Sequence, residues 1–177
     1  VARHGVVVTT TLFERFGLGL EHKLVQLAYE VRFLTYGSPW PLQQAPTGVL
    51  PFAFVHLAYV REPAGHAIYL NGTPVVAAGP GPCAASCLVA EGVTPTTIGS
   101  QLGAGYTVDE LRVSRVARYH GPFTPQRFFA TDADTAMLLH FEEAQGNTVH
   151  DTSGHGQVGT IVTGVPQWVA VGPPPTF

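Results

Sequence analysis

The chain has 177 residues, of which 45% are hydrophobic and 12% are charged, and its formal net charge is −3 at pH 7. This composition excludes a disordered chain and a coiled coil, and the length suits one domain with a buried core. The nine Lys and Arg residues are scattered singly, so no basic surface for nucleic acid or an anionic membrane is expected. No apolar run reaches the roughly 18–20 residues that a membrane-spanning helix requires.

Strand-forming patterns dominate the first part of the chain. β-Branched residues fill 6–11, and 23–37 alternates around a break near Ala28. This break predicts two strands joined by a turn, with a helix as the alternative. Residues 37–51 contain Trp40 and four prolines and are predicted to form a loop.

The clearest local pattern is a predicted strand followed by a hairpin. Residues 52–60 alternate between two faces, and 66–77 is typical of a hairpin. Its Asn71-Gly72 pair supplies the two positive φ angles that a type I′ turn requires. Asn71 also begins a glycosylation sequon, for which the turn is the simpler explanation.

The second part of the chain continues as short strands between polar loops. Strands are predicted over 96–100, over an alternating stretch at 106–119, over 135–143 and within 159–171, and a glycine-rich loop is predicted over 144–159. About ten short strands with little helix predict an all-β, two-sheet sandwich.

Cys83 and Cys87 are the only cysteines of the chain. Three residues separate them in a loop rich in Pro and Gly, so we expect a small disulfide loop formed in an oxidising compartment. Two free, buried thiols are the alternative, whereas zinc would require more ligands than this pair supplies.

Three blocks of sequence resemble laminin-G-like domains of the concanavalin A-like lectin/glucanase superfamily. They are the block FAFVHLAYVREPAGHAIYLNGTPV, the block TTIGSQLGAGYTVDELRVSRVARYHGPFTP, and the block MLLHFEEAQGNTVHDTSGHGQVGTIVTGVPQWV. Together they cover roughly residues 52–168. The resemblance implies an antiparallel jelly-roll sandwich over 1–171, followed by a flexible tail at 172–177.

The order of these blocks differs from the family pattern, in which the third block usually opens a domain. We therefore expect residues 136–170 to supply the strand that normally opens the fold. The alternative is the end of one domain followed by the start of another.

Asp151 lies in a glycine-rich loop of the kind that suits calcium, a cation that takes six to eight oxygen ligands. The resemblance implies a structural calcium ion here, with Asp109 or Glu110 as partner and the Gly154 carbonyl as a further ligand. The family's usual Asn is His155 in this chain, which weakens side-chain ligation at that position. The alternative is an Asx-type turn in which Asp151 binds its own loop.

The acidic residues give no catalytic pattern when they are placed on extended strands. Glu142 and Glu143 then point to opposite faces, as do Asp109 and Glu110, so neither pair matches the two carboxylates of a glycosidase. His140 is expected to be a hydrogen-bonded sheet histidine, because its spacing from the other histidines does not match a zinc motif. We therefore expect no enzymatic activity.

These inferences predict a non-catalytic, lectin-like module that is secreted or displayed at the cell surface. Sugars bind exposed aromatic rings flanked by amides, so Trp40, Tyr36 and Tyr106 are the predicted glycan-binding residues. A structural or protein-binding accessory subunit of a larger assembly is the alternative, and a degenerate glucanase is a third hypothesis.

Overall fold

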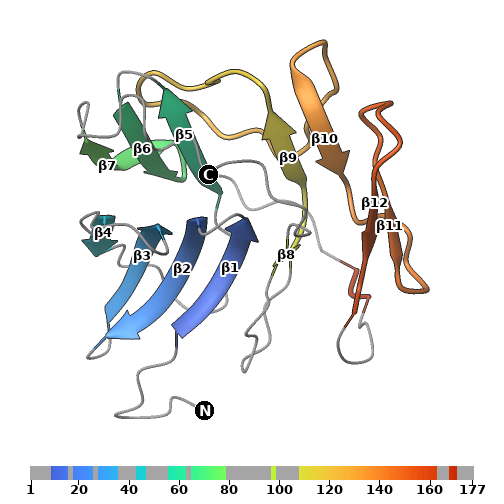
Figure 1. Ribbon diagram of the computed structural model, residues 1–177, viewed down its shortest axis with the longest axis horizontal. Helices are drawn as coiled ribbons and strands as arrows, with labels where there is room; N and C mark the ends of the chain where they lie inside the picture. Colours follow the sequence, from blue (N-terminus) through green and yellow to red (C-terminus); the bar gives the residue numbers. More distant parts are fainter. Residues whose placement is uncertain are drawn as a thin grey trace. The chain divides into compact units, whose positions relative to one another are not determined.

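The computed structural model describes part of the chain. Its backbone is described over residues 9–15, 18–25, 28–35, 43–46, 56–62, 65–78, 97–98, 108–162 and 168–170, and its side chains over 56–60, 67–75, 108–162 and 168–170. Within these ranges all regular structure is β-strand, as the all-β prediction requires (Figure 1). None of these residues belongs to a helix long and apolar enough to cross a membrane. The tail at 172–177 lies outside them.

The chain divides into two compact units, Val1–Tyr106 and Thr107–Phe177. The first unit contains an antiparallel five-stranded sheet of order β4-β3-β2-β1-β8. Its strands are β1 (Thr9–Arg15), β2 (Leu18–Val25), β3 (Ala28–Thr35), β4 (Gln43–Pro46) and β8 (Thr97–Ile98).

The predicted break near Ala28 is confirmed as the start of a strand, and the helix alternative is wrong. β2 and β3 pair from Val25 opposite Ala28 to Leu18 opposite Thr35. The loop predicted over 37–51 is wrong at β4, which pairs with β3 along the edge of the sheet. The prolines in this segment favour a loop prediction. An edge strand tolerates proline, however, because on its outer side there is no neighbouring strand to which an N–H would donate.

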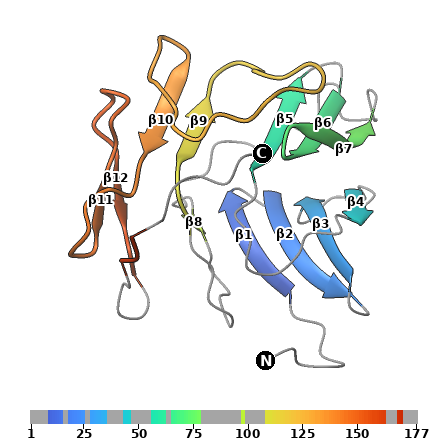
Figure 2. The same cartoon turned by 180° about the vertical axis from the view of Figure 1, so that it is seen from behind.

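The first unit also contains a three-stranded meander, which Figure 2 shows from behind: β5 (Leu57–Glu62), β6 (Gly65–Leu70) and β7 (Thr73–Ala78). The predicted tight turn is confirmed by positive φ angles of 48° at Asn71 and 78° at Gly72. The Asn71 side chain also accepts a hydrogen bond of 2.8 Å from the backbone N–H of His56. Asn71 therefore closes the meander as well as the turn. Among the described side chains of the meander, Val60, Ile68 and Tyr69 are the buried apolar ones.

The described residues of the second unit form two antiparallel strand pairs. β9 (Leu111–Ser114) pairs with β10 (Thr135–Leu139), and β11 (Thr148–His150) pairs with β12 (Val158–Thr160) (Figure 1). An isolated β-bridge between Leu139 and Asp151 links the two pairs. Among the described residues of this unit, the buried apolar side chains are Leu138, Leu139 and Val149.

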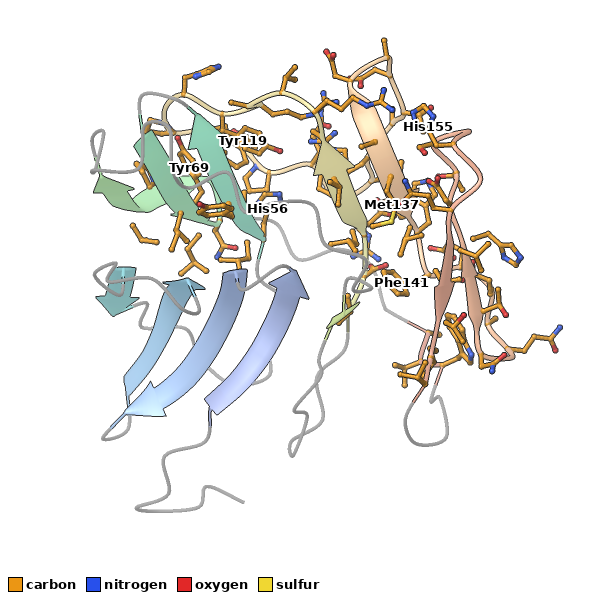
Figure 3. All side chains as sticks on the ribbon, viewed as in Figure 1. His56, Tyr69, Tyr119, Met137, Phe141 and His155 are labelled. Carbon is orange, nitrogen blue, oxygen red and sulfur yellow. The ribbon has the colours of Figure 1, made fainter. Side chains whose placement is uncertain are left out.

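Both strands of the first pair are shorter than their alternating sequences predict. Within the described part of 106–119 the strand covers only Leu111–Ser114, and 135–143 forms a strand only as far as Leu139. Glu110 has a φ of 54° and Phe141 a φ of 59°. These left-handed conformations end the extended backbone of each strand, and Figure 3 shows Phe141 at that end of the pair. The loop predicted over 144–159 is likewise wrong at β11, which gains its ladder bonds from β12.

An arginine–aspartate pair holds the long connection between β9 and β10. The Arg118 guanidinium donates to both carboxylate oxygens of Asp132 over 2.6 and 2.7 Å and to the Ser114 hydroxyl over 2.6 Å. Since bidentate pairs of this kind favour the ionised carboxylate, Arg118 lowers the pKa of Asp132. The connection is therefore fixed at both of its ends.

Replacing Thr135 by valine is expected to lower the free energy of unfolding by about 1–2 kcal/mol. Thr135 is fully buried, and its hydroxyl donates to Asp132 over 2.8 Å and accepts from Arg118 over 3.3 Å. Valine has the same shape and cannot make these bonds. Urea denaturation measures the loss, with the exposed Thr131→Val as the control. Equal stabilities of the two variants would contradict the prediction.

Candidate functional site

The residues predicted to bind a glycan, Trp40, Tyr36 and Tyr106, lie outside the described residues, as do Cys83 and Cys87. The aromatic site and the disulfide therefore stay predictions. The described geometry bears instead on the acidic and histidine residues of the second unit.

Asp151 organises the loop that follows β11. Its Oδ1 accepts hydrogen bonds of 2.9 Å from the backbone N–H groups of Leu138 and Ser153, and its Oδ2 accepts one of 2.7 Å from the Ser153 hydroxyl and one of 3.3 Å from the Gln157 N–H. Burial alone would raise the pKa of this carboxyl, but the hydrogen bonds outweigh it and lower the pKa to about 2. The bond from Ser153 two residues on makes this the Asx-type turn that was the alternative to a calcium site.

The donor set around Asp151 does not suit a calcium ion. A carboxylate offers about four lone-pair directions, and four N–H and O–H donors already fill them at Asp151. Gly154 adopts a φ of 87°, which serves the turn. Asp109, the predicted partner, lies 3.9 Å from the Arg127 guanidinium. No group of three or more His, Cys, Asp or Glu residues within the described ranges is arranged to hold a metal ion. These contacts do not favour calcium at Asp151, and its support is the family resemblance alone.

A buried glutamate holds a histidine at the open end of the β9–β10 pair. The Glu110 carboxylate accepts from the Phe129 N–H over 2.9 Å through one oxygen and lies 2.7 Å from His140 Nδ1 through the other. The Glu110 side chain is 7% exposed and that of His140 is 27% exposed. His140 is thus hydrogen-bonded, as predicted. Its partner Glu110 precedes β9, and His140 itself follows β10. Neither residue therefore lies in the strand that the alternation predicts for it.

Asp109 lies beside this pair, and the charge of Glu110 affects its pKa. Burial, followed by the negative charges of Glu110 and Glu142, raises the pKa of Asp109, and Arg127 opposes the shift. The prediction that Asp109 and Glu110 point to opposite faces assumes that both lie on a strand. This assumption is wrong, since both residues precede β9. Like-charged carboxylates therefore crowd together at one end of the strand pair, with Arg127 as the cation that opposes their repulsion.

The segment that leads from β10 into β11 forms a surface depression. It is open to solvent and is lined by polar residues and a glycine: Glu143, Gln145, Gly146, Asn147, Thr148 and His150. The side chains of Gln145, Asn147 and His150 are exposed. Positive φ angles at Ala144 and Gly146 produce the tight bend of this segment.

Three hydrogen bonds tether the segment. The Glu143 carboxylate accepts from the backbone N–H of His150 over 2.8 Å, so the two ends of the bend are closed on each other. The Asn147 carbonyl accepts from the N–H of Ile161 over 2.8 Å. The Gly146 carbonyl accepts from the indole Nε1 of Trp168 over 2.9 Å. The depression is therefore pre-formed, with a partly exposed indole at its margin.

Glu143 supplies the only carboxylate among the residues that line this depression. Its Oε1 holds the His150 backbone and lies 3.4 Å from His150 Nδ1. Its Oε2 is buried and has no hydrogen-bond partner within the described part of the chain. This oxygen therefore lies beneath the surface, out of reach of a ligand in the depression.

The sequence pattern did not indicate this site. The alternation predicts a strand through Glu143, and the residues that follow it predict a glycine-rich loop. The signal present in the sequence is the polar run Glu143–His150 around Gly146, followed by an aromatic residue twenty-two positions after that glycine. This local pattern does not predict the hydrogen bond between Trp168 and Gly146.

The chain was compared with models of protein families, with curated proteins and with solved structures, and no match was found in any of the three.

Proposed function

We propose that the protein is a non-catalytic, lectin-like module of the jelly-roll type that acts outside the cell and binds a glycan in the depression at 143–150. The observation that carries the proposal is the indole of Trp168, held by hydrogen bond to the rim of a pre-formed polar depression. The family resemblance supports the jelly roll and the lectin-like role, and the all-β structure of the described residues is consistent with both.

The depression offers the groups that sugar recognition uses. Sugars present hydroxyl groups that both donate and accept hydrogen bonds, together with apolar C–H faces that pack on aromatic rings. Here Gln145 and Asn147 supply amides, Thr148 a hydroxyl and Glu143 a carboxylate, with Trp168 beside them. Because the tethers order the bend before binding, little conformational entropy has to be lost on association.

A glycan array tests this proposal, with Trp168→Ala as the variant and Phe128→Ala as the control. We expect the wild type to bind at least one class of glycan and Trp168→Ala to lose about tenfold in affinity, which corresponds to about 1.4 kcal/mol. Phe128 is an exposed aromatic residue outside the lining of the depression, and it lacks the bond to Gly146 that places Trp168 at the rim, so its removal should leave binding unchanged. Absence of any bound glycan, or equal effects of the two substitutions, would contradict the proposal.

A protein-binding accessory subunit is the second candidate function. Three valines in the last part of the chain favour it, since Val158, Val162 and Val169 are 61%, 80% and 60% exposed. Exposed apolar side chains mark sites of protein association where they form one contiguous patch, as this function would require of the three valines. Co-purification of a stoichiometric protein partner, together with a blank glycan array, would favour this function over the first.

A further inference from the structure

We infer that the outer edge of β12 binds the same edge of a second copy of this chain, so that the two β11–β12 pairs join in one continuous antiparallel sheet. The inference goes beyond the proposed function and does not depend on a bound glycan. It follows from the direction of the main-chain groups of β12, from the exposure of its side chains and from its lack of charge.

The main-chain groups of β12 alternate between β11 and the outer edge. In an antiparallel pair, successive residues direct their N–H and C=O groups to opposite sides of the strand. The Gln157 carbonyl and the Ile161 N–H bond to the residues that flank β11, over 3.3 and 2.8 Å. Val158 and Thr160 lie between them in the alternation and face outward, and no hydrogen bond to their outward groups occurs within the described part of the chain. The outer edge of β12 therefore offers donors and acceptors to a further strand.

The two edges of the β11–β12 pair differ in charge. On the β11 side, the outward N–H of His150 donates to the Glu143 carboxylate over 2.8 Å. A charged side chain thus covers that edge, which is a common protection of strands that do not pair with another chain. β12 has no such charge of its own, because residues 156–177 include no Asp, Glu, Lys, Arg or His.

The side chains of β12 suit the addition of a strand. Exposure alternates along 158–162, where Val158, Thr160 and Val162 are exposed. Gly159 belongs to the opposite face, on which a Cβ at its position would lie 3.4 Å from the Val149 Cβ. The exposed face is therefore made of β-branched residues, the type that packs well between neighbouring strands.

The charge pattern identifies the partner as a second copy. In a two-fold contact each surface meets itself, so a charged residue near the axis would lie close to its own copy. The uncharged sequence of β12 avoids this repulsion. With Thr160 on the axis, the two copies of Thr160 lie opposite each other, and Val158 of one chain lies opposite Val162 of the second. Both are favourable cross-strand pairs.

Sedimentation equilibrium of the purified 177-residue chain tests the inference, with Thr160→Lys as the variant and Thr131→Lys as the control. We expect the wild type to dimerise with a Kd below about 1 mM and Thr160→Lys to weaken the dimer about tenfold, because two ammonium groups then meet near the axis. Thr131 is exposed and lies outside the strands, so Thr131→Lys should dimerise as the wild type does. A wild type that is monomeric up to about 1 mM, or equal effects of the two substitutions, would overturn the inference.

Cross-linking locates the contact. Thr160→Cys places two thiols across the axis, at the Cα separation of about 5.5 Å that hydrogen-bonded antiparallel pairs share with disulfides. We expect a disulfide-linked dimer of Thr160→Cys under mild oxidation. Thr131→Cys and the wild type, which carries Cys83 and Cys87, should give no such dimer and report any cross-linking through the native thiols. Absence of the Thr160→Cys cross-link while the wild type dimerises would place the contact elsewhere and overturn the inference.

Discussion

Replacement of Asp151 by alanine is expected to lower the free energy of unfolding by about 3 kcal/mol, because hydrogen bonds to a charged acceptor are worth about 1.5–3 kcal/mol each when they are shielded and less when partly solvated. The Asp151 carboxylate accepts from Leu138 of β10 as well as from Ser153 and Gln157 of its own loop. Its removal therefore loosens the contact between β10 and the β11–β12 pair along with the turn. Chemical denaturation measures the change, and Asp134→Ala is the control, since Asp134 is exposed.

The Asp151 carboxylate also makes the free energy of unfolding depend on pH. The pKa of Asp151 is lowered from its ordinary value of 3.8 to about 2 in the folded chain. A depressed carboxyl pKa contributes stability that is fully present above the unfolded value and is lost as the pH falls through the folded value. We therefore expect the contribution of Asp151 to decline between about pH 4 and pH 2. Asp151→Asn should be less stable at pH 7 and should show a smaller loss over this range than the wild type.

A chelator distinguishes this account from a calcium site. Because the lone pairs of Asp151 are taken by N–H and O–H donors, the melting temperature should be the same with EDTA and with added calcium. A melting temperature that falls with EDTA and recovers with calcium would establish the ion that the family resemblance implies. It would also require the turn around Asp151 to rearrange.

The parts of the fold that could be predicted are those whose cause is local. The Asn71-Gly72 turn was predictable because few residues tolerate two successive positive φ angles. The break near Ala28 was predictable because the alternation changes phase there. By contrast, Glu110 and Phe141 adopt left-handed conformations without being Gly or Asn. Only tertiary contacts stabilise such residues there, so the ends of β9 and β10 could not be read from alternation.

The candidate site could be predicted only in part, for the same reason. The sequence indicated a turn at Asp151 as one of two alternatives, and a hydrogen bond for His140 without its partner. The depression depends on contacts between residues far apart in the chain, of which the bond from Trp168 to Gly146 spans 22 positions. Strand β11 is three residues long, and its extended conformation is stabilised by pairing with β12 rather than by its own composition. Short elements held by partners of this kind carry little signal of their own.

The largest effect among the charged residues of the strand pair is expected at Glu110, whose replacement by alanine should lower the free energy of unfolding by about 2–4 kcal/mol. Its carboxylate is almost fully buried and has two partners, the Phe129 N–H and His140 Nδ1. Alanine leaves both without their acceptor. Glu110→Gln keeps an acceptor oxygen and should lose about 1 kcal/mol. Thermal and chemical denaturation of the two variants measure these differences.

Backbone strain at Glu110 is separated from its side-chain contacts by a third variant. Glu110→Gly loses the same contacts as Glu110→Ala but tolerates the φ of 54°, so it should be more stable than the alanine variant by about 1 kcal/mol. The charge of Glu110 has its own readout, since it raises the pKa of Asp109. In Glu110→Gln the pKa of Asp109, followed by NMR titration, should fall. An Asp109 that titrates as in the wild type would contradict the role of the Glu110 charge. A glycine variant no more stable than the alanine one would contradict the role of backbone strain.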